Sequence, residues 1–141
     1  DRIDLYYFGR GHTDGDAWVV FPALRVMQTS DSFSGKNPPY LDARNGASSI
    51  DYPETLARVV ATLSNIDSVI IGHSGVMTWD DLQEYVDFNR ELLATVTASL
   101  KAGQSIEEVA KTYTIPAKYE GYDFRYPFPD YVQVVSDQMA D

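Results

Sequence analysis

A glycine-rich loop that carries a histidine joins two strand-like runs near the start of the chain. Ile3 to Phe8 alternates apolar and polar side chains, a pattern typical of a strand with one buried face. Ala17 to Phe21 is continuously apolar, which is typical of a strand covered on both faces. Between these runs lies the segment GRGHTDGD, residues 9–16. Rigid strands on both sides are expected to hold His12 in place, while the glycines leave its side chain free to reach a ligand.

Two more polar residues stand where a strand-like run ends. Arg25 to Thr29 is expected to return antiparallel to the preceding run, which predicts a hairpin, and Asp31 follows it. Ser68 to Ile71 is a short apolar strand that glycine breaks before His73. The chain has only two histidines, and both of them, like Asp31, lie where a strand gives way to a loop. Such positions are typical of the rim of an active site.

The chemistry of these side chains suits a metal. Zinc binds imidazole nitrogen and carboxylate oxygen, and a catalytic zinc keeps one position open for water. His12 and His73 can each supply a nitrogen, and Asp31 can bridge two ions that together activate a water. Asp14 and Asp16 flank the loop histidine and can hydrogen-bond its second nitrogen or brace the loop. Each residue alone also has a structural interpretation, as a surface or core histidine or as a turn or capping aspartate.

A long irregular segment, Ser30 to Ser49, follows the predicted hairpin and is rich in Ser, Gly, Asn and Pro. Loops of this length are uncommon in compact domains unless they serve a purpose. The segment is therefore either a surface excursion or a loop that faces a substrate. Lys36, Tyr40 and Arg44 can meet an anionic or polar substrate there, or can simply be solvated.

Capping patterns predict helices that begin after Asp51, Thr78 and Ser105. Strands come first, followed by helix, strand and helix, and this order predicts a mixed sheet covered by helices on one face, an α/β (α+β) fold. Residues 1–113 are expected to form this domain. Residues 114–141 are aromatic and proline-rich, which predicts an extended tail that packs on the domain or on a partner.

Composition excludes several classes of function. A chain of 141 residues that is 44% hydrophobic can form one globular domain with a core. Its net charge of −10 leaves no clustered basic face for nucleic acid. No apolar run approaches the roughly 20 residues that span a bilayer, so we expect no membrane segment. The absence of cysteine rules out disulfides and thiolate metal ligands.

Three segments of the chain, taken together, resemble a known family. The segments are GRGHTDGD at 9–16, VMQTSDSF at 26–33 and IIGHSG at 70–75. In order and separation they resemble the second half of the metallo-β-lactamase superfamily, over about Ile3 to Leu100. The resemblance implies a zinc-dependent hydrolase that acts on a small molecule, an ester, thioester, lactone or amide.

The resemblance also implies a role for each candidate ligand. His12 would complete the first metal site, Asp31 would bridge both metals, and His73 would join the second site, with two zinc ions in the complete fold. An aspartate rather than a cysteine at the bridging position is more similar to the glyoxalase II, lactonase and general hydrolase branches. Ser30 departs from the family, because a glycine is common at that position.

The chain lacks the other half of the family's ligands. They lie in a His-x-His-x-Asp-His motif in the first half of an αββα sandwich, and no such motif occurs here. We therefore expect one ββα-type half, inactive alone, with an apolar sheet face that needs a cover. The missing N-terminal half is expected to come from the same polypeptide, a second chain or a symmetric copy. We favour a fragment, because the chain starts within a strand. The alternative is a non-catalytic binding or assembly module that keeps the scaffold.

Overall fold

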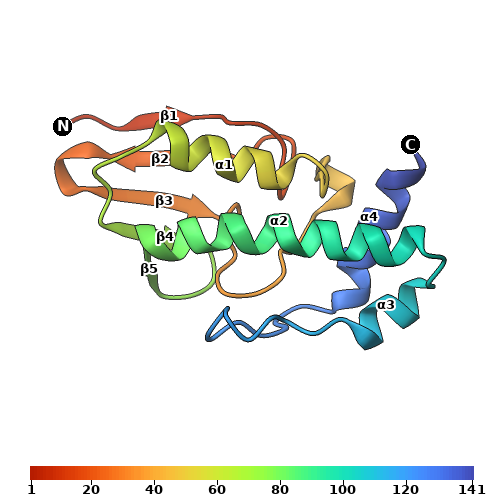
Figure 1. Ribbon diagram of the computed structural model, residues 1–141. Coiled ribbons are helices and arrows are strands. Elements are labelled where there is room, and N and C mark those ends of the chain that lie inside the picture. The colour runs from red at the N-terminus through yellow and green to blue at the C-terminus, as the bar shows by residue number, and fades with distance from the viewer.

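The computed structural model describes residues 1–141 and contains a five-stranded mixed sheet (Figure 1). The strands are β1 (Asp4–Tyr6), β2 (Trp18–Phe21), β3 (Val26–Ser30), β4 (Ser68–Ile71) and β5 (Val76–Thr78). The α-helices are α1 (Tyr52–Thr62), α2 (Trp79–Lys101), α3 (Ile106–Thr112) and α4 (Phe128–Ala140). The strands lie in chain order across the sheet, and only the β3–β4 pair is parallel.

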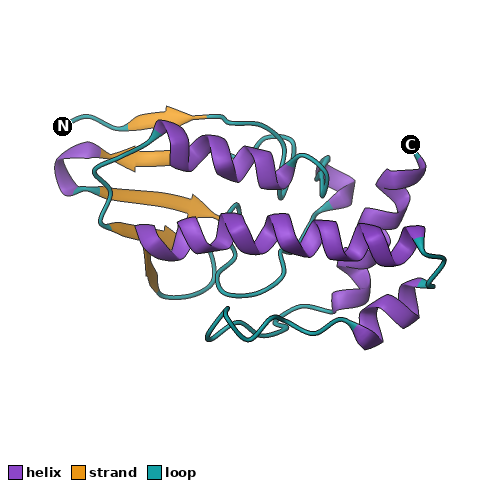
Figure 2. Ribbon diagram, in the orientation of Figure 1, coloured by secondary structure: helices purple, strands orange, loops and turns teal.

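The helices cover one face of the sheet, as predicted. Helices α1 and α2 lie side by side in front of the strands, and α3 and α4 pack around the far end of α2 (Figure 2). None of the helices combines the length and apolar character that crossing a membrane requires.

The helix-covered face of the sheet forms the core. Val20, Met27 and Val69 are cross-strand neighbours and make one buried row. Trp18 is fully buried beside them, and Leu56 of α1 is fully buried in the same cluster. Each such side chain contributes about 1.5–3 kcal/mol when it is fully removed from water, so this row fixes the register of the central strands.

The opposite face of the sheet is apolar and open. Leu5, Ile70 and Val76 lie on this face, and their exposed fractions are 71%, 40% and 65%. The prediction that the sheet leaves an apolar face uncovered is confirmed. Within residues 1–141 the second run is covered on one face only, because Val19 and Phe21, which point to this open face, are half-buried.

Two of the three predicted helix caps are confirmed. Thr78 and Ser105 each begin a helix with a complete capping box. Asp51 does not cap α1, because its own backbone is already helical and its side chain makes no capping bond. The chain turns earlier, where Ser48 Oγ accepts a hydrogen bond of 3.0 Å from the Asp51 amide.

The predicted extended tail is wrong over its second half. Residues 114–127 contain no helix or strand, but Phe128–Ala140 forms α4 and packs against α2 and α3. Pro129 lies in the first turn, where a missing amide hydrogen does no harm. The aromatic residues are spaced for a helix, which the proline-rich composition masked. The buried side chains of this helix are Phe128, Tyr131, Val132 and Val135.

The long segment 30–49 is packed into the domain, so the interpretation as a surface excursion is wrong. Phe33 is fully buried. Asn37 Nδ2 donates to Ser34 Oγ at 3.2 Å, and that hydroxyl lies 3.1 Å from the hydroxyl of Tyr85 on α2. The segment therefore follows a fixed path from β3 to α1.

Candidate metal centre

The structure brings His12, Asp31 and His73 together at one edge of the sheet. Asp31 and His73 follow the parallel neighbours β3 and β4, whose ends lie at the same edge, and the His12 loop enters antiparallel β2 there. His73 Nε2 lies 3.1 Å from Asp31 Oδ1 and 3.3 Å from its Oδ2. His12 Nε2 lies 3.7 Å from Asp31 Oδ2. The Asp31 carboxylate therefore lies between the imidazoles of His12 and His73.

The imidazole of His12 has a defined orientation. Its Nδ1 lies 2.9 Å from the backbone carbonyl oxygen of Tyr40. A carbonyl oxygen can only accept a hydrogen bond, so Nδ1 is the donor to Tyr40, and this bond turns Nε2 toward Asp31. Second partners of this kind fix the tautomer and the direction of histidines that bind metals.

The donor atoms suit zinc, but the set is incomplete. At zinc–ligand distances of 2.0–2.2 Å, neighbouring ligand atoms of a tetrahedral site lie about 3.3 Å apart, close to the separations around Asp31. No group of three or more His, Cys, Asp or Glu side chains in the structure is arranged to hold one ion. Asp31 instead forms two pairs, one with each imidazole. Each pair offers two of the three or four ligands that zinc takes.

Asp16 braces the histidine loop rather than the imidazole. Its Oδ1 accepts hydrogen bonds from the amide of Thr13 at 2.9 Å and from the Thr13 hydroxyl at 2.6 Å. Asp14 is exposed, and its amide donates to the Asn45 carbonyl. Of the two roles that the sequence allowed, Asp16 has the second and braces the loop, while the Tyr40 carbonyl lies at the second nitrogen of His12.

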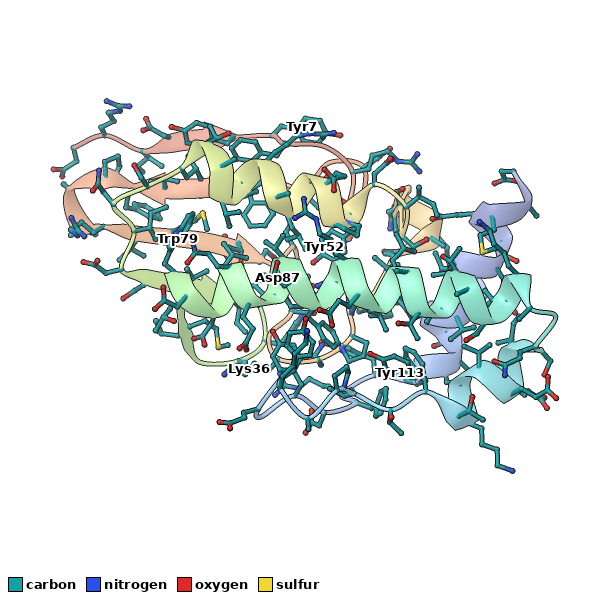
Figure 3. The ribbon with its side chains drawn as sticks, in the orientation of Figure 1. Tyr7, Lys36, Tyr52, Trp79, Asp87 and Tyr113 are labelled. Carbon is teal, nitrogen blue, oxygen red and sulfur yellow. The ribbon has the colours of Figure 1, made fainter.

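Tyr52 lies at the start of α1 (Figure 3) and contacts both the His12 loop and the loop that follows Asp31. Its ring lies so close to Gly11 that a Cβ there would be 2.6 Å from ring atom Cδ2. Its hydroxyl donates to the Ser32 carbonyl at 2.6 Å, one residue after Asp31. Burial raises the pKa of Tyr52 well above its ordinary value, so the phenol stays protonated and keeps donating. Sequence reasoning missed this residue, because nothing in its neighbourhood distinguishes it from other core tyrosines.

The residues around Asp31 also shape its position. A methyl group at Gly72 would overlap Asp31 Oδ1 and would approach the backbone of Ser30 to 3.2 Å. Ser30 itself has a φ of +49°, in the left-handed region. That conformation explains the preference for glycine at this position that the family resemblance implies.

The three predicted substrate-loop residues have different surroundings. Lys36 Nζ lies 3.4 Å from Asp81 Oδ1 at the start of α2, so its charge is already paired. The ring of Tyr40 lies 5.7 Å from the His12 ring. Arg44 is exposed and lines, with Tyr40, a separate hollow of about 170 Å³. Only Tyr40 contacts a candidate ligand.

An open hollow of about 310 Å³ lies directly beside the centre. His12 and Asp31 line it together with Val19 and Gln28, two side chains of the open sheet face. The candidate ligands are thus reached from the uncovered side of the sheet, and a group that covers that side would also cover the centre.

Solved structures with the same arrangement of elements are metallo-β-lactamases. The enzyme from Erythrobacter litoralis matches with a TM-score of 0.55 and 18% identity, over 63% of this chain and 39% of its own. The enzyme from Pontibacter korlensis matches with a TM-score of 0.53 and 16% identity, over 62% of this chain and 41% of its own. DIM-1 matches with a TM-score of 0.54 and 17% identity, over 64% of this chain and 42% of its own. This chain has the metallo-β-lactamase fold.

The match is partial. The chain spans about two-fifths of the length of these lactamases, which is consistent with a C-terminal half of the metallo-β-lactamase fold. No protein-family model and no curated protein matches the sequence. At these identities the likeness establishes the fold, and the resemblance predicted from the three sequence segments is confirmed at that level.

Proposed function

We propose that the chain is the C-terminal part of a zinc-dependent hydrolase of the metallo-β-lactamase fold, which cleaves an ester, thioester, lactone or amide of a small molecule. The observation that carries this proposal is the position of Asp31 between His12 and His73 at one edge of the sheet. The fold of the chain supports it, because the solved structures that match are metallo-β-lactamases.

Each candidate ligand has a separate role in the proposal. His12 and His73 would each hold one zinc ion, and Asp31 would be shared by both. Zinc, when bound, lowers the pKa of a water and polarises the carbonyl that the water attacks. The chain's own residues prepare the site: Tyr40 holds the imidazole of His12 through its carbonyl, and Tyr52 holds the Asp31 loop through its hydroxyl.

The remaining ligands must come from outside residues 1–141. This chain offers two ligands to each zinc position, fewer than a catalytic zinc takes, so it is inactive alone. The proposed source is the N-terminal half of the fold, and its docking surface is the open sheet face. That face is apolar, as at Leu5 and Val76, and it adjoins the hollow beside His12.

Zinc titration of the natural polypeptide that contains residues 1–141 tests this proposal. Alanine at Asp31, which removes a ligand from both positions, should weaken zinc binding by at least about 100-fold, and alanine at His12 should remove one ion. Asp14→Ala is the matched control, because that exposed carboxylate lies on the same loop and makes no side-chain hydrogen bond. Unchanged zinc affinity in Asp31→Ala would refute the assignment.

A second candidate function is a binding or assembly module without chemistry. It is favoured by the lack of a closed group of three metal-binding side chains. Such a module would purify without metal, and its unfolding temperature would not change when a chelator is added. Near-stoichiometric zinc that is lost in His12→Ala would exclude this alternative.

A further inference from the structure

The loop that carries His12 is joined along its outer side to the segment 40–48. The Arg10 guanidinium donates to the carbonyls of Gly46 at 2.9 Å and Ala47 at 3.4 Å. Four further hydrogen bonds connect the two, and one of them sets the direction of the imidazole. They are His12 Nδ1 to the Tyr40 carbonyl at 2.9 Å and, each at 3.0 Å, the amides of Asp42, Asp14 and Ser48 to the carbonyls of His12, Asn45 and Gly11. The position of His12 therefore depends on where residues 40–48 are held.

Helix α4 holds that segment from the outside. Gln138 Nε2 donates to the Ala47 carbonyl at 2.8 Å. Its Oε1 accepts from the Ser49 amide at 2.8 Å and from the Ser49 hydroxyl at 2.7 Å. The amide group of one side chain thus fixes Ala47 of the segment and Ser49 directly after it. Both partners are buried, and Gln138 itself is half-buried.

A second contact reaches the segment from the residues before α4. The ring of Tyr126 lies 5.5 Å from the ring of Tyr40, at an angle of 48°. The Tyr40 ring lies in turn 5.7 Å from the His12 ring. Aromatic pairs at these separations attract one another. Tyr126 therefore supports the residue whose carbonyl orients the imidazole.

The other two candidate ligands are held differently. Asp31 and His73 follow β3 and β4, and the Gly72 amide donates to the Ser30 carbonyl at 3.1 Å between these two loops. No hydrogen bond joins residues 114–141 to Asp31 or His73. The sheet positions this pair. The C-terminal residues reach the support of His12 through Gln138 and Tyr126, and their hydrogen bond to the segment after Asp31, from the Asp123 amide to the Lys36 carbonyl, lies five residues beyond that carboxylate.

We propose that Gln138 and Tyr126 are positioning residues for His12, so that the C-terminal part of the chain controls one side of the metal centre and not the other. The consequence for zinc rests on the proposed function. The mechanical coupling itself is a property of the metal-free chain and is testable without zinc.

Hydrogen exchange on the metal-free chain tests the coupling. In Gln138→Ala, the amides of Asp42 and Ser48 should exchange on the order of tenfold faster, because three hydrogen bonds that restrain the segment are lost. The amide of Gly72 should not change. Gln133→Ala is the matched control, since that glutamine lies on the same helix and bonds only Asp137 at the surface. Equal exchange in the two variants would overturn the proposal.

A pair of Tyr126 variants keeps the test independent of any damage to α4. Tyr126→Phe preserves the ring and should behave as the parent chain, whereas Tyr126→Ala should accelerate exchange at Asp42. Faster exchange in both variants, or in neither, would contradict the role of the ring.

The zinc measurement extends the test to the centre. Zinc affinity should fall about tenfold in Gln138→Ala and stay unchanged in Gln133→Ala. If His12→Ala leaves zinc binding intact, the proposed function fails while the exchange result still stands. If exchange at the His12 loop is the same in Gln138→Ala and Gln133→Ala, the positioning role fails whatever the zinc affinity.

Discussion

The two imidazoles that flank Asp31 are held in opposite ways. The side chain of His12 is 14% exposed, and its Nδ1 is bonded to a backbone carbonyl. The side chain of His73 is 68% exposed, and its only hydrogen bond goes to Asp31. The loop 72–75 that carries His73 is exposed throughout.

This difference shows which of the two histidine side chains the fold already restricts to one conformation. Restricting a side chain to one conformation has an entropic cost, and the fold has already met that cost for His12. His73 is restrained by Asp31 alone, so more of the cost of fixing its side chain is left to be met when a ligand binds. The fold thus orients the His12 side of the candidate centre in advance and leaves the His73 side to be fixed by the ligand. We call these two sides the His12 arm and the His73 arm. Four substitutions separate the two arms, from the largest expected effect to the smallest.

Gly11→Ala should disrupt the His12 arm most. The new methyl group would lie 2.6 Å from the Tyr52 ring, and that ring is fully buried and has no room to move. We expect a loss of about 2–3 kcal/mol in the free energy of unfolding, measured by urea denaturation. Gly15→Ala, in the same loop with open space around it, is the control and should change little. Equal losses in both variants would show that the tyrosine does not support the loop.

Gly72→Ala should act on the carboxylate and His73. The methyl group would overlap Asp31 Oδ1, so the carboxylate must swing away from the imidazole. We expect zinc affinity to fall about tenfold, or about 1.4 kcal/mol, with little change in stability because a terminal carboxylate moves easily. Isothermal titration compares this variant with Gly75→Ala, where the methyl group meets nothing. Parent-like affinity in Gly72→Ala would contradict the placement of Asp31.

Tyr52→Phe should loosen the Asp31 loop while preserving the ring below Gly11. Without the phenol, the buried Ser32 carbonyl loses its partner, which costs about 1 kcal/mol of unfolding free energy. Urea denaturation measures the loss, and Tyr7→Phe, at an exposed tyrosine beside β1 (Figure 3), is the control. A destabilisation as large as that of Gly11→Ala would mean that Tyr52 supports the loops mainly through its hydroxyl and not through its ring.

Ser30→Gly should have the smallest effect, and it should be stabilising. A side chain in the left-handed region costs about 1–2 kcal/mol, and glycine adds about 0.5–1 kcal/mol of chain entropy to the unfolded state. The net gain in unfolding free energy is about 0.5 kcal/mol. A measurable loss would indicate that the Ser30 side chain has a role in the turn beyond its strained backbone.

The sequence predicted which three side chains lie close together and not how they are supported. His12, Asp31 and His73 each follow or precede a short strand with a clear end, and strand order alone then brings them to one edge. Their supports come from distant positions. Tyr52 contacts Gly11 and Ser32, and no local pattern records contacts between residues so far apart along the chain.

Sequence reasoning also missed two secondary-structure elements, one because it is short and one because its composition conceals its helical spacing. Strand β5, Val76–Thr78, has only three residues and so offers too few positions for a period of two. Helix α4 hides its helical spacing among prolines and aromatic residues. Lys36 looked free in a polar loop, but the ion pair with Asp81 depends on a turn that only the folded chain makes.

The open sheet face has a practical consequence for anyone who handles the isolated chain. At neutral pH a net charge of −10 keeps separate molecules apart despite the bare apolar row at Leu5, Ile70 and Val76. Near the isoelectric point of about 4.4 that repulsion vanishes. Molecules can then associate through this apolar row, and acidification should precipitate the chain before it unfolds.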